Sequence, residues 1–469
     1  MNDVSPSSHV VTPEKAITDY GIDASALGRR YVTQRRIWVN DLLDVPVADM
    51  SIAPPIYIHN TIDAMKSAPV LPLAEIHAAI TEAAERFQFG ILEGLSPDEY
   101  CQRVHRTTGL PSNVIQEALT SIANALRIMP ETLDIGMPRG ARWSWRDPDA
   151  LAGCSLFSRK GDTFSVLAAG NGPGIHALWP QAVALGYRVL VRPSSREPFT
   201  AQRVISALAM SGLENYVAFI PTDYRGADAL VTSTDFTLAY GGSEMVEKYR
   251  HHPTVRIQGP GRSKIVVGAD ADRDEAVALV AKSMTDLGGA ACVSTSAVLV
   301  EGDVTDFCQR LRLALKHIPA HRLPLGSAKT VEQLSRVSGD SIHHPFDAPL
   351  TPFGYLLQPA VIELSEFDDP RLQQELPFPC VFVAPYLATK SISMLAGSLV
   401  VTVFSRQQKL LRPVLDESSI SNVYIGAIPT TWMSLLVPHD DYLCTFLMCS
   451  RGVRVNAFWD DVTTTGEKQ

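Results

Sequence analysis

The sequence predicts an α/β protein whose main feature is a parallel, doubly wound sheet. From residue 163, strand-like and helix-like segments alternate over about 100 residues, which is typical of parallel strands covered by helices. The chain has 469 residues, of which 46% are hydrophobic and 19% charged, so it can bury sizeable cores. At roughly 150 residues per domain, this length predicts about three domains or two large ones.

The first part of the chain is predicted to be a polar tail and an arm, followed by helices. Short β-favouring pieces at 35–39 and 56–58 predict an N-terminal strand pair or arm. From 73 to 133, apolar residues recur at helical spacing, and Ser96 before a proline is a predicted helix N-cap. We expect substrate-pocket residues from this helical region and from the chain after residue 420.

Predicted strands and helices alternate through the later part of the chain, as they do in a parallel sheet. Such sheets place ligands at the carboxyl ends of their strands. A Pro- and His-rich stretch at 341–352 is predicted to be a loop. Strands are predicted at 164–169, 188–191, 217–221, 236–240, 265–267, 296–300, 380–384 and 398–404. Helices are predicted up to residue 185, at 201–211, from residue 243 and at 274–284.

Charge, hydropathy and cysteine usage exclude several classes of protein. Lys and Arg total 41 against 50 Asp and Glu, a net charge of −9, whereas nucleic-acid and anionic-membrane binders need a basic field. No apolar run reaches the roughly 18–20 residues of a membrane span, and the first residues lack a signal-peptide layout. Seven thinly spread cysteines are typical of reduced thiols, and none forms a cluster with metal-ligand spacing. These features predict a cytoplasmic enzyme without a metal.

Two motifs beside predicted strands carry groups suited to covalent catalysis. Cys292 follows small residues that let a ligand approach the backbone, and a thiol in such a loop is well placed as a nucleophile. Asn171 follows a strand in a Gly-Asn-Gly-Pro-Gly run, where its amide can donate to a developing oxyanion. Each motif has a plainer interpretation, a small buried hydrophobe for the cysteine and a tight turn for the asparagine.

Two further motifs are suited to phosphate groups. A run of two arginines and two serines follows the strand at 188–191, and such a sheet edge suits a phosphate or a 2′-phosphoribose. A Gly-Gly-Ser lies between the strand at 236–240 and the next helix, where free N–H groups can bind an anion. A solvated turn and plain helix capping are the alternatives. The residues concerned are Arg192, Ser194, Ser195, Arg196, Gly242 and Ser243.

In this order and spacing, the four motifs resemble the aldehyde dehydrogenase superfamily. Segments 178–194 and 265–276 are similar to two of its motifs, and Cys292 stands where its catalytic cysteine belongs. Glu375 begins a run similar to the family's Glu-…-Phe-Gly-Pro-Val, and the likeness extends over roughly residues 160 to 430. The resemblance implies a Rossmann-like cofactor domain, an α/β catalytic domain and a small oligomerisation element, in a homo-oligomer.

Within that superfamily the chain resembles the LuxC-type acyl-CoA reductases of bacterial luminescence more closely. Similar motifs lie at 166–171, 194–201, 239–242, 258–263 and 289–295. That resemblance implies an acyl thioester substrate, carried by coenzyme A or by an acyl carrier protein. It also implies a partner protein that activates or transfers the acyl group.

The resemblance also implies a mechanism and a cofactor. Cys292 would attack the thioester, Asn171 and the Cys292 N–H would hold the oxyanion, and NADPH would reduce the acyl-cysteine to an aldehyde. Glu375 would hold the nicotinamide ribose. The segment 257–260, Ile-Gln-Gly-Pro, replaces the family's Glu-Leu-Gly-Gly, so no carboxylate remains to act as the general base, and hydrolysis is expected to be slow. Ser195 replaces a ribose-binding glutamate, which leaves the two arginines to bind a 2′-phosphate and favours NADP over NAD.

The implied domains are an N-terminal arm at 1–60, a cofactor-binding domain at 61–268 and a catalytic domain at 269–435. A C-terminal segment at 436–469 would return to the first domain or to an oligomer interface. Two alternatives stay open: oxidation of an aldehyde with NAD(P), in which another group replaces the missing base, and a non-catalytic acyl-transfer scaffold.

Two polar or thiol-bearing segments near the carboxyl end are interpreted as structural. The segment 439–441, His-Asp-Asp, is interpreted as a solvated loop, with a proton-transfer group near the substrate as the alternative. Cys444 and Cys449 lie in an apolar stretch that predicts a core strand.

Overall fold

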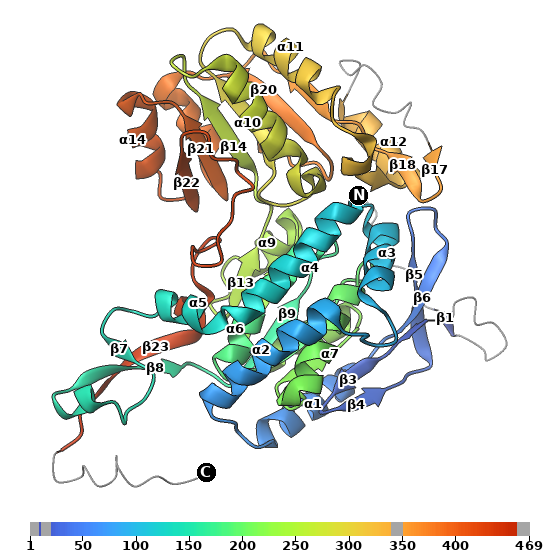
Figure 1. The fold of residues 1–469 in the computed structure, drawn as a ribbon, viewed down its shortest axis with the longest axis vertical. Helices are drawn as coiled ribbons and strands as arrows, with labels where there is room; N and C mark the ends of the chain where they lie inside the picture. Colours follow the sequence, from blue (N-terminus) through green and yellow to red (C-terminus); the bar gives the residue numbers. More distant parts are fainter. Residues whose placement is uncertain (1–8, 11–19, 339–349, 457–469) are drawn as a thin grey trace.

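The computed structural model describes residues 9–10, 20–338 and 350–456. Figure 1 shows two α/β bodies, one around β9 and one around β14, with a long β-ribbon that extends away from the first. The predicted N-terminal tail and most of the predicted loop at 341–352 lie outside the described residues. Among the residues described, no helix has both the length and the apolar composition needed to cross a bilayer.

The first body is built on a seven-stranded sheet in the order β13-β12-β9-β10-β11-β3-β4. β9 to β13 run parallel, and the β3–β4 hairpin adds to the edge in the antiparallel sense. From β9 the chain first adds β10 and β11 on one side and then β12 and β13 on the other. The point between β9 and β12 is therefore a topological switch point, where such sheets bind ligands. The strands are β3 (Ala24–Ala26), β4 (Arg29–Tyr31), β9 (Thr163–Leu167), β10 (Arg188–Arg192), β11 (Val217–Phe219), β12 (Phe236–Tyr240) and β13 (Val255–Gln258).

Helices join these strands and bury apolar faces against them, as the sequence alternation predicts. β9 and β10 are buried along nearly their whole length, which explains their continuous apolar runs. The helices are α6 (Pro180–Ala184), α7 (Phe199–Leu208), α8 (Tyr224–Ser233) and α9 (Ser243–Tyr249).

The second body contains a six-stranded, fully parallel sheet in the order β19-β20-β15-β14-β21-β22. The strands are β14 (Ser263–Val267), β15 (Thr295–Val300), β19 (Ala360–Glu363), β20 (Cys380–Pro385), β21 (Val400–Phe404) and β22 (Asn422–Ile425). The helices around it are α10 (Arg273–Thr285), α11 (Val304–Leu315), α12 (Ala328–Ser338), α13 (Ile392–Leu395) and α14 (Gln408–Asp416). A small sheet of β16 (Leu325–Gly326), β18 (Gly354–Leu356) and β17 (Leu350–Thr351) lies beside α12.

A layer of helices covers the first sheet, as the spacing between 73 and 133 predicts. Ser96 forms a complete capping box with Glu99, so the predicted N-cap is confirmed. The predicted strand at 56–58 is wrong, because a proline at the first position starts a helix there whose Ile58 and Ile62 face the core. The helices are α1 (Pro55–Ser67), α2 (Leu73–Phe89), α3 (Pro97–Thr108), α4 (Ser112–Arg127) and α5 (Met129–Gly136).

The two ends of the described chain each add a small sheet. Strands β1 (His9–Val10), β5 (Arg35–Asn40), β6 (Pro46–Ser51) and β2 (Gly21–Ile22) form one of them. β7 (Ala141–Arg142), β8 (Cys154–Arg159) and β23 (Met448–Val453) form the projecting ribbon in Figure 1. Helix α15 (Leu443–Leu447) precedes β23, so the strand predicted for Cys444 is wrong, although that thiol is buried as expected. The predicted domain boundaries stay predictions.

Candidate active site

Cys292 lies in the short loop that connects α10 to β15, where the second sheet begins. Its thiol is free and half-buried, and its carbonyl accepts a hydrogen bond from Ser263 Oγ at 2.8 Å. The preceding turn bends through Leu287, Gly288 and Gly289, all with positive φ, and Gly289 packs against a backbone that leaves no room for a side chain. The small residues therefore fix the course of the loop that presents the thiol.

Asn171 lies in the loop after β9 and contacts the cysteine loop. Its Nδ2 donates to the carbonyl of Ala290 at 3.2 Å, although the two residues are far apart in the sequence. Asn171 is exposed, so its amide remains accessible to a substrate. The structure thus brings together the two motifs that the sequence singles out for covalent catalysis.

His439 is a site residue that the sequence indicated only through the alternative interpretation of segment 439–441, a proton-transfer group near the substrate. It lies in the loop between β22 and α15, and its Nε2 is 3.7 Å from the Sγ of Cys292. The segment 439–441 is a loop, as predicted, but the His439 side chain is only 28% exposed, so the imidazole is less solvated than predicted. In the sequence, only the adjacent carboxylate of Asp440 indicated a catalytic role for His439. The fold shows that the His439 imidazole contacts the Cys292 thiol.

Asp440 is held by two residues of β13. Its Oδ1 accepts from Arg256 Nη2 at 3.1 Å, and its Oδ2 accepts from Gln258 Nε2 at 2.9 Å. Arg256 and Gln258 alternate along the strand and so face the same side. Gln258, in the segment 257–260 that replaces the family's Glu-Leu-Gly-Gly, therefore anchors a carboxylate from another part of the chain.

Glu375 lies beside the crossing from β13 to β14. Its Oε2 accepts from the backbone N–H of Arg262 at 3.2 Å, and burial raises the pKa of this carboxyl despite that hydrogen bond. Behind it, the buried Lys264 donates to the carbonyl of Arg262 at 2.8 Å and to Ser398 Oγ at 2.9 Å. Burial, together with the charge of Arg262, lowers the pKa of Lys264 to about 7.

The predicted phosphate motif occupies the loop after β10, next to the Asn171 loop. A Cβ placed on Gly170 would lie 2.3 Å from Ser194 Oγ, so the two loops pack closely. The arginines bind backbone carbonyls. Arg192 Nε donates to Thr222 at 3.2 Å, and Arg196 donates through Nε and Nη2 to the carboxyl end of α3. Ser195 lies between them and is half-buried.

Gly242 and Ser243 begin helix α9, at the strand switch beside β9. Gly242 is the N-cap and makes no side-chain capping bond, and a Cβ built there would have no neighbour within 4 Å. This open space at the start of α9 lies at the strand switch, and a site at such a point of the sheet suits a dinucleotide. No group of three or more His, Cys, Asp or Glu side chains able to hold a metal occurs in the described part of the chain.

A polar groove of about 600 Å³ lies between α4 and the loop after β22. Met433 and Leu435 line it from the loop, so the two regions expected to supply substrate contacts lie side by side. α4 also packs against the segment Pro173–Ala177 that follows Asn171. From α4 the groove is lined by Asn113, Gln116, Glu117, Thr120, Ser121 and Asn124.

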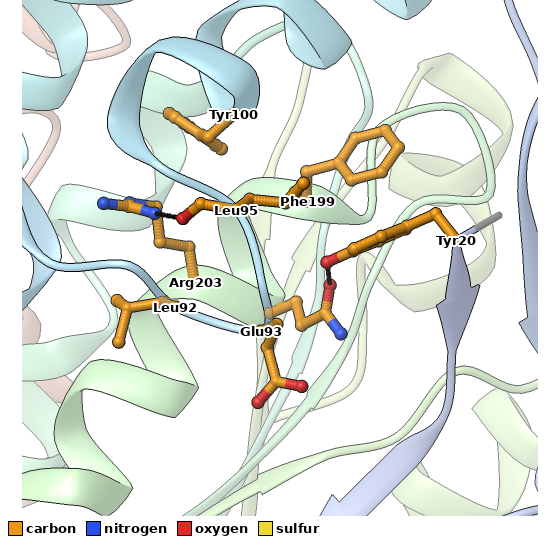
Figure 2. Close-up of a pocket in the computed structure, with 8 residues that line it drawn as sticks. Tyr20, Leu92, Glu93, Leu95, Tyr100, Phe199 and Arg203 are labelled. Atoms are coloured by element: carbon orange, nitrogen blue, oxygen red, sulfur yellow. Dashed lines mark hydrogen bonds between the residues drawn. The ribbon is translucent and has the colours of Figure 1, made fainter.

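Figure 2 shows a much smaller cavity, of about 10 Å³, beside α7. Arg203 donates to the carbonyl of Leu95 at 3.2 Å, and the hydroxyl of Tyr20 donates to Gln202 Oε1 at 3.1 Å. This volume holds roughly one water molecule. None of its lining residues belongs to the site around Cys292, so we do not consider it a substrate site.

Glu197, in the loop after β10, gives a testable pH dependence of stability. It is fully buried; its Oε1 accepts from Thr200 N at 2.8 Å, whereas Oε2 has no partner. Burial raises the pKa of Glu197 from 4.5 to about 7. The folded state therefore binds the extra proton between these values, and the free energy of unfolding should fall by ~3 kcal/mol as pH rises from about 4.5 to 7.

The comparison that isolates this group is Glu197→Gln against the wild type. The variant should be more stable than the wild type above pH 7, and the difference between their free energies of unfolding should shrink toward pH 4.5. Urea unfolding at several pH values measures it. A difference that does not change with pH would contradict the assignment.

Comparison of the sequence with models of known protein families identifies one family that matches more than half of the chain. The model of the Aldehyde dehydrogenase family matches residues 164–439. Malonate-semialdehyde dehydrogenase of Lacticaseibacillus casei is 28% identical over 153 residues, which are 30% of this chain and 30% of that enzyme. The chain thus spans about a third of the length of curated relatives that it matches.

Solved structures show the same fold over nearly the whole chain. A point mutant of the 1-pyrroline-5-carboxylate dehydrogenase of Thermus thermophilus superimposes with a TM-score of 0.74 and 16% identity, covering 92% of both chains. The NAD+ complex of an aldehyde dehydrogenase from Bacillus cereus gives 0.74 and 16%, covering 96% of this chain and 100% of that one. The α/β fold implied by the resemblance is therefore confirmed, and the chain belongs to the aldehyde dehydrogenase family.

Proposed function

We propose that this protein oxidises an aldehyde with NAD(P)+ through a covalent intermediate on Cys292. The observation that carries the proposal is the convergence of three segments: the Cys292 loop, the Asn171 loop bonded to it, and His439 beside the thiol. A nucleophile, an amide donor and a proton acceptor are the groups that aldehyde oxidation by way of a thioester requires. Family membership and the malonate-semialdehyde dehydrogenase relative support the same reaction class.

In this mechanism each residue has one task. The Cys292 thiolate attacks the aldehyde carbon, and the Nδ2 of Asn171 with the Cys292 N–H holds the oxyanion. The nicotinamide cofactor, when bound, accepts the hydride and leaves an acyl-cysteine. Glu375, Ser194, Ser195, Gly242 and Ser243 are proposed to hold that cofactor. Water then attacks the acyl-cysteine and releases a carboxylic acid.

The test is formation of reduced nicotinamide from a panel of aldehydes without added thiol, followed by absorbance. The panel should pair alkyl aldehydes with hydroxylated aldehydes of equal length, because the polar lining of the groove favours a substrate with hydrogen-bonding groups. Release of a carboxylic acid confirms oxidation. No turnover of any aldehyde, with intact protein and both cofactors, would reject the proposal.

A second candidate reaction is reduction of an acyl thioester to an aldehyde, as in the LuxC-type acyl-CoA reductases. It is favoured by one observation, the absence of a carboxylate from segment 257–260, which replaces the family's Glu-Leu-Gly-Gly. Acyl-CoA thioesters with NADPH test it, and added coenzyme A in the oxidative assay tests the reverse direction. Turnover only when a thiol is present would favour thioester reduction over aldehyde oxidation. A carrier protein and an acyl-donating partner are proposed only for thioester reduction.

We propose NADP(H) as the preferred cofactor, with Arg192 as the ligand of the 2′-phosphate. Arg192 is anchored through Nε and lies 5.9 Å from the ring centroid of Tyr224 at the edge of the sheet. Arg192→Ala should raise the KM for NADP+ by about tenfold or more, the effect of a lost charge-assisted hydrogen bond, and leave that for NAD+ within about twofold.

The matched control is Arg196→Ala. Its guanidinium binds the carbonyls of Thr107 and Thr108, so the variant should change both KM values alike. Steady-state kinetics with each cofactor measures the ratio. An unchanged ratio for Arg192→Ala would contradict its role.

A homo-oligomer stays a prediction that sedimentation can test.

A further inference from the structure

The basic side chain of His439 contacts the nucleophile, and the fold fixes its position. Its Nε2 lies 3.7 Å from Sγ, within the range of a hydrogen bond to sulfur. Its backbone carbonyl accepts from Nδ2 of Asn422, at the start of β22. The loop that carries His439 is therefore attached to the same sheet whose β15 follows Cys292, which keeps ring and thiol together.

The opposite nitrogen of the ring faces a carboxylate. Nδ1 is buried without a hydrogen-bond partner and lies 3.9 Å from Asp440 Oδ1, so the interaction in this structure is electrostatic. Asp440 in turn is fixed from β13 by Arg256 and Gln258, as described above. A thiol, an imidazole and an anchored carboxylate thus lie in sequence, the order found where a base orients and activates a nucleophile.

The charges around the ring favour the imidazolium. Those that face it are the Cys292 thiol and Asp440; Arg256 is partly neutralised by Asp440 and by Asp441, whose Oδ2 is 3.7 Å away. The hydroxyl of Tyr240, from β12, donates to a carbonyl, and burial raises its pKa, so it stays neutral. Burial opposes the charge on His439, but Asp440 and Cys292 outweigh it and raise the pKa of His439 to about 10.

We propose that His439, positioned by Asp440, is the proton acceptor that takes the place of the family's missing glutamate in both halves of the reaction. This inference rests on the proposed function for its second half only. The first half, formation of a thiolate–imidazolium pair, is a property of the resting protein. Because the pair needs no substrate or cofactor, it can be tested by itself.

The steps balance as follows. The Sγ proton moves to Nε2, and the thiolate forms a C–S bond with the aldehyde carbon. After hydride loss to the oxidised cofactor, the acylated sulfur carries no charge, so the imidazolium loses its partner and releases its proton to solvent. The neutral Nε2 then takes a proton from water as the water oxygen bonds to the acyl carbon and the C–S bond breaks. One aldehyde, one oxidised cofactor and one water give one acid, one reduced cofactor and one proton.

The first test is the rate of Cys292 alkylation by iodoacetamide from pH 5 to pH 10, read by mass spectrometry of the Cys292 peptide. In the wild type the rate should stay nearly constant across neutral pH. In His439→Asn the rate should depend steeply on pH and fall at least tenfold at pH 6, because the thiol has lost the group that accepts its proton. Asp440→Asn should give an intermediate profile, which a merely structural role would not produce, and the exposed His59→Asn is the control.

The second test follows reduced nicotinamide in the first turnovers with an aldehyde. His439→Asn and His439→Gln should keep a burst of about one equivalent and lose ~10²–10³-fold in the steady state, because deacylation lacks its base. A His439→Asn protein that is folded by melting temperature and keeps the wild-type alkylation profile and steady-state rate overturns the inference. Absence of aldehyde turnover in every variant, with the alkylation profile still shifted, rejects the proposed function and not the thiolate–imidazolium pair.

Discussion

Replacing Cys292 with alanine is expected to abolish aldehyde oxidation, with a loss on the order of 10⁴-fold or more in kcat. The thiol is the group to which the carbonyl carbon bonds, and neither Asn171 nor His439 can replace a covalent intermediate. Removing the side chain leaves the loop intact, because its carbonyl, not its thiol, makes the hydrogen bond to Ser263. Stability should therefore change little.

The measurement pairs steady-state formation of reduced nicotinamide with a thermal melt. Cys449→Ala is the matched control, a half-exposed thiol in β23 that belongs to the ribbon and not to the site. It should keep wild-type kinetics. Turnover by Cys292→Ala within tenfold of the wild type would mean that hydride transfer proceeds without a cysteine adduct, and the mechanism proposed above would be abandoned.

The second large effect is expected from Gly261→Ala, which changes no reacting group. A Cβ at Gly261 would lie 1.8 Å from the carbonyl oxygen of Cys292, and the obstacle is backbone, so no side chain can move to relieve it. The cysteine loop must shift, and misplacement of a reacting group by about 1 Å costs ~10²-fold. We expect a loss of at least that size in kcat and slower alkylation of Cys292.

Gly452→Ala serves as the control, because a Cβ there has no neighbour within 4 Å and the residue lies in the distant ribbon. It should leave kinetics and alkylation as in the wild type. Full activity in Gly261→Ala would show that the two loops are not in contact in solution.

The strand and helix pattern predicted the sheets well because buried parallel strands read as continuous apolar runs. The sequence around β9, β10, β12, β14 and β15 carries that signal directly. The strand predicted at 56–58 was wrong because the prediction gave more weight to three β-favouring residues than to the two prolines that begin α1. Local propensity decided the prediction, whereas the proline start and the i, i+4 burial of Ile58 and Ile62 decide the structure.

The candidate site was predicted only where a motif is local. Cys292 and Asn171 stand in short runs with a recognisable composition, so each could be proposed from its own segment. For His439 the sequence indicated a proton-transfer role only as an alternative, because its partner thiol is 147 residues away and only the packing of two loops brings them together. The same holds for Gln258. The sequence shows that segment 257–260 lacks a carboxylate, but only the fold shows that Gln258 binds Asp440 from a distant part of the chain.

The pairing of β23 with β8 also constrains how the molecule is made. These strands are joined in register from Met448–Arg159 to Val453–Cys154, and Leu443 and Leu447 just before them belong to the main core of the first body. Roughly 290 residues separate the partners, so this closure is among the most non-local in the fold. On the ribosome, the first body therefore stays incomplete until almost the whole chain has emerged, with β8 exposed as an open edge that other chains can pair with.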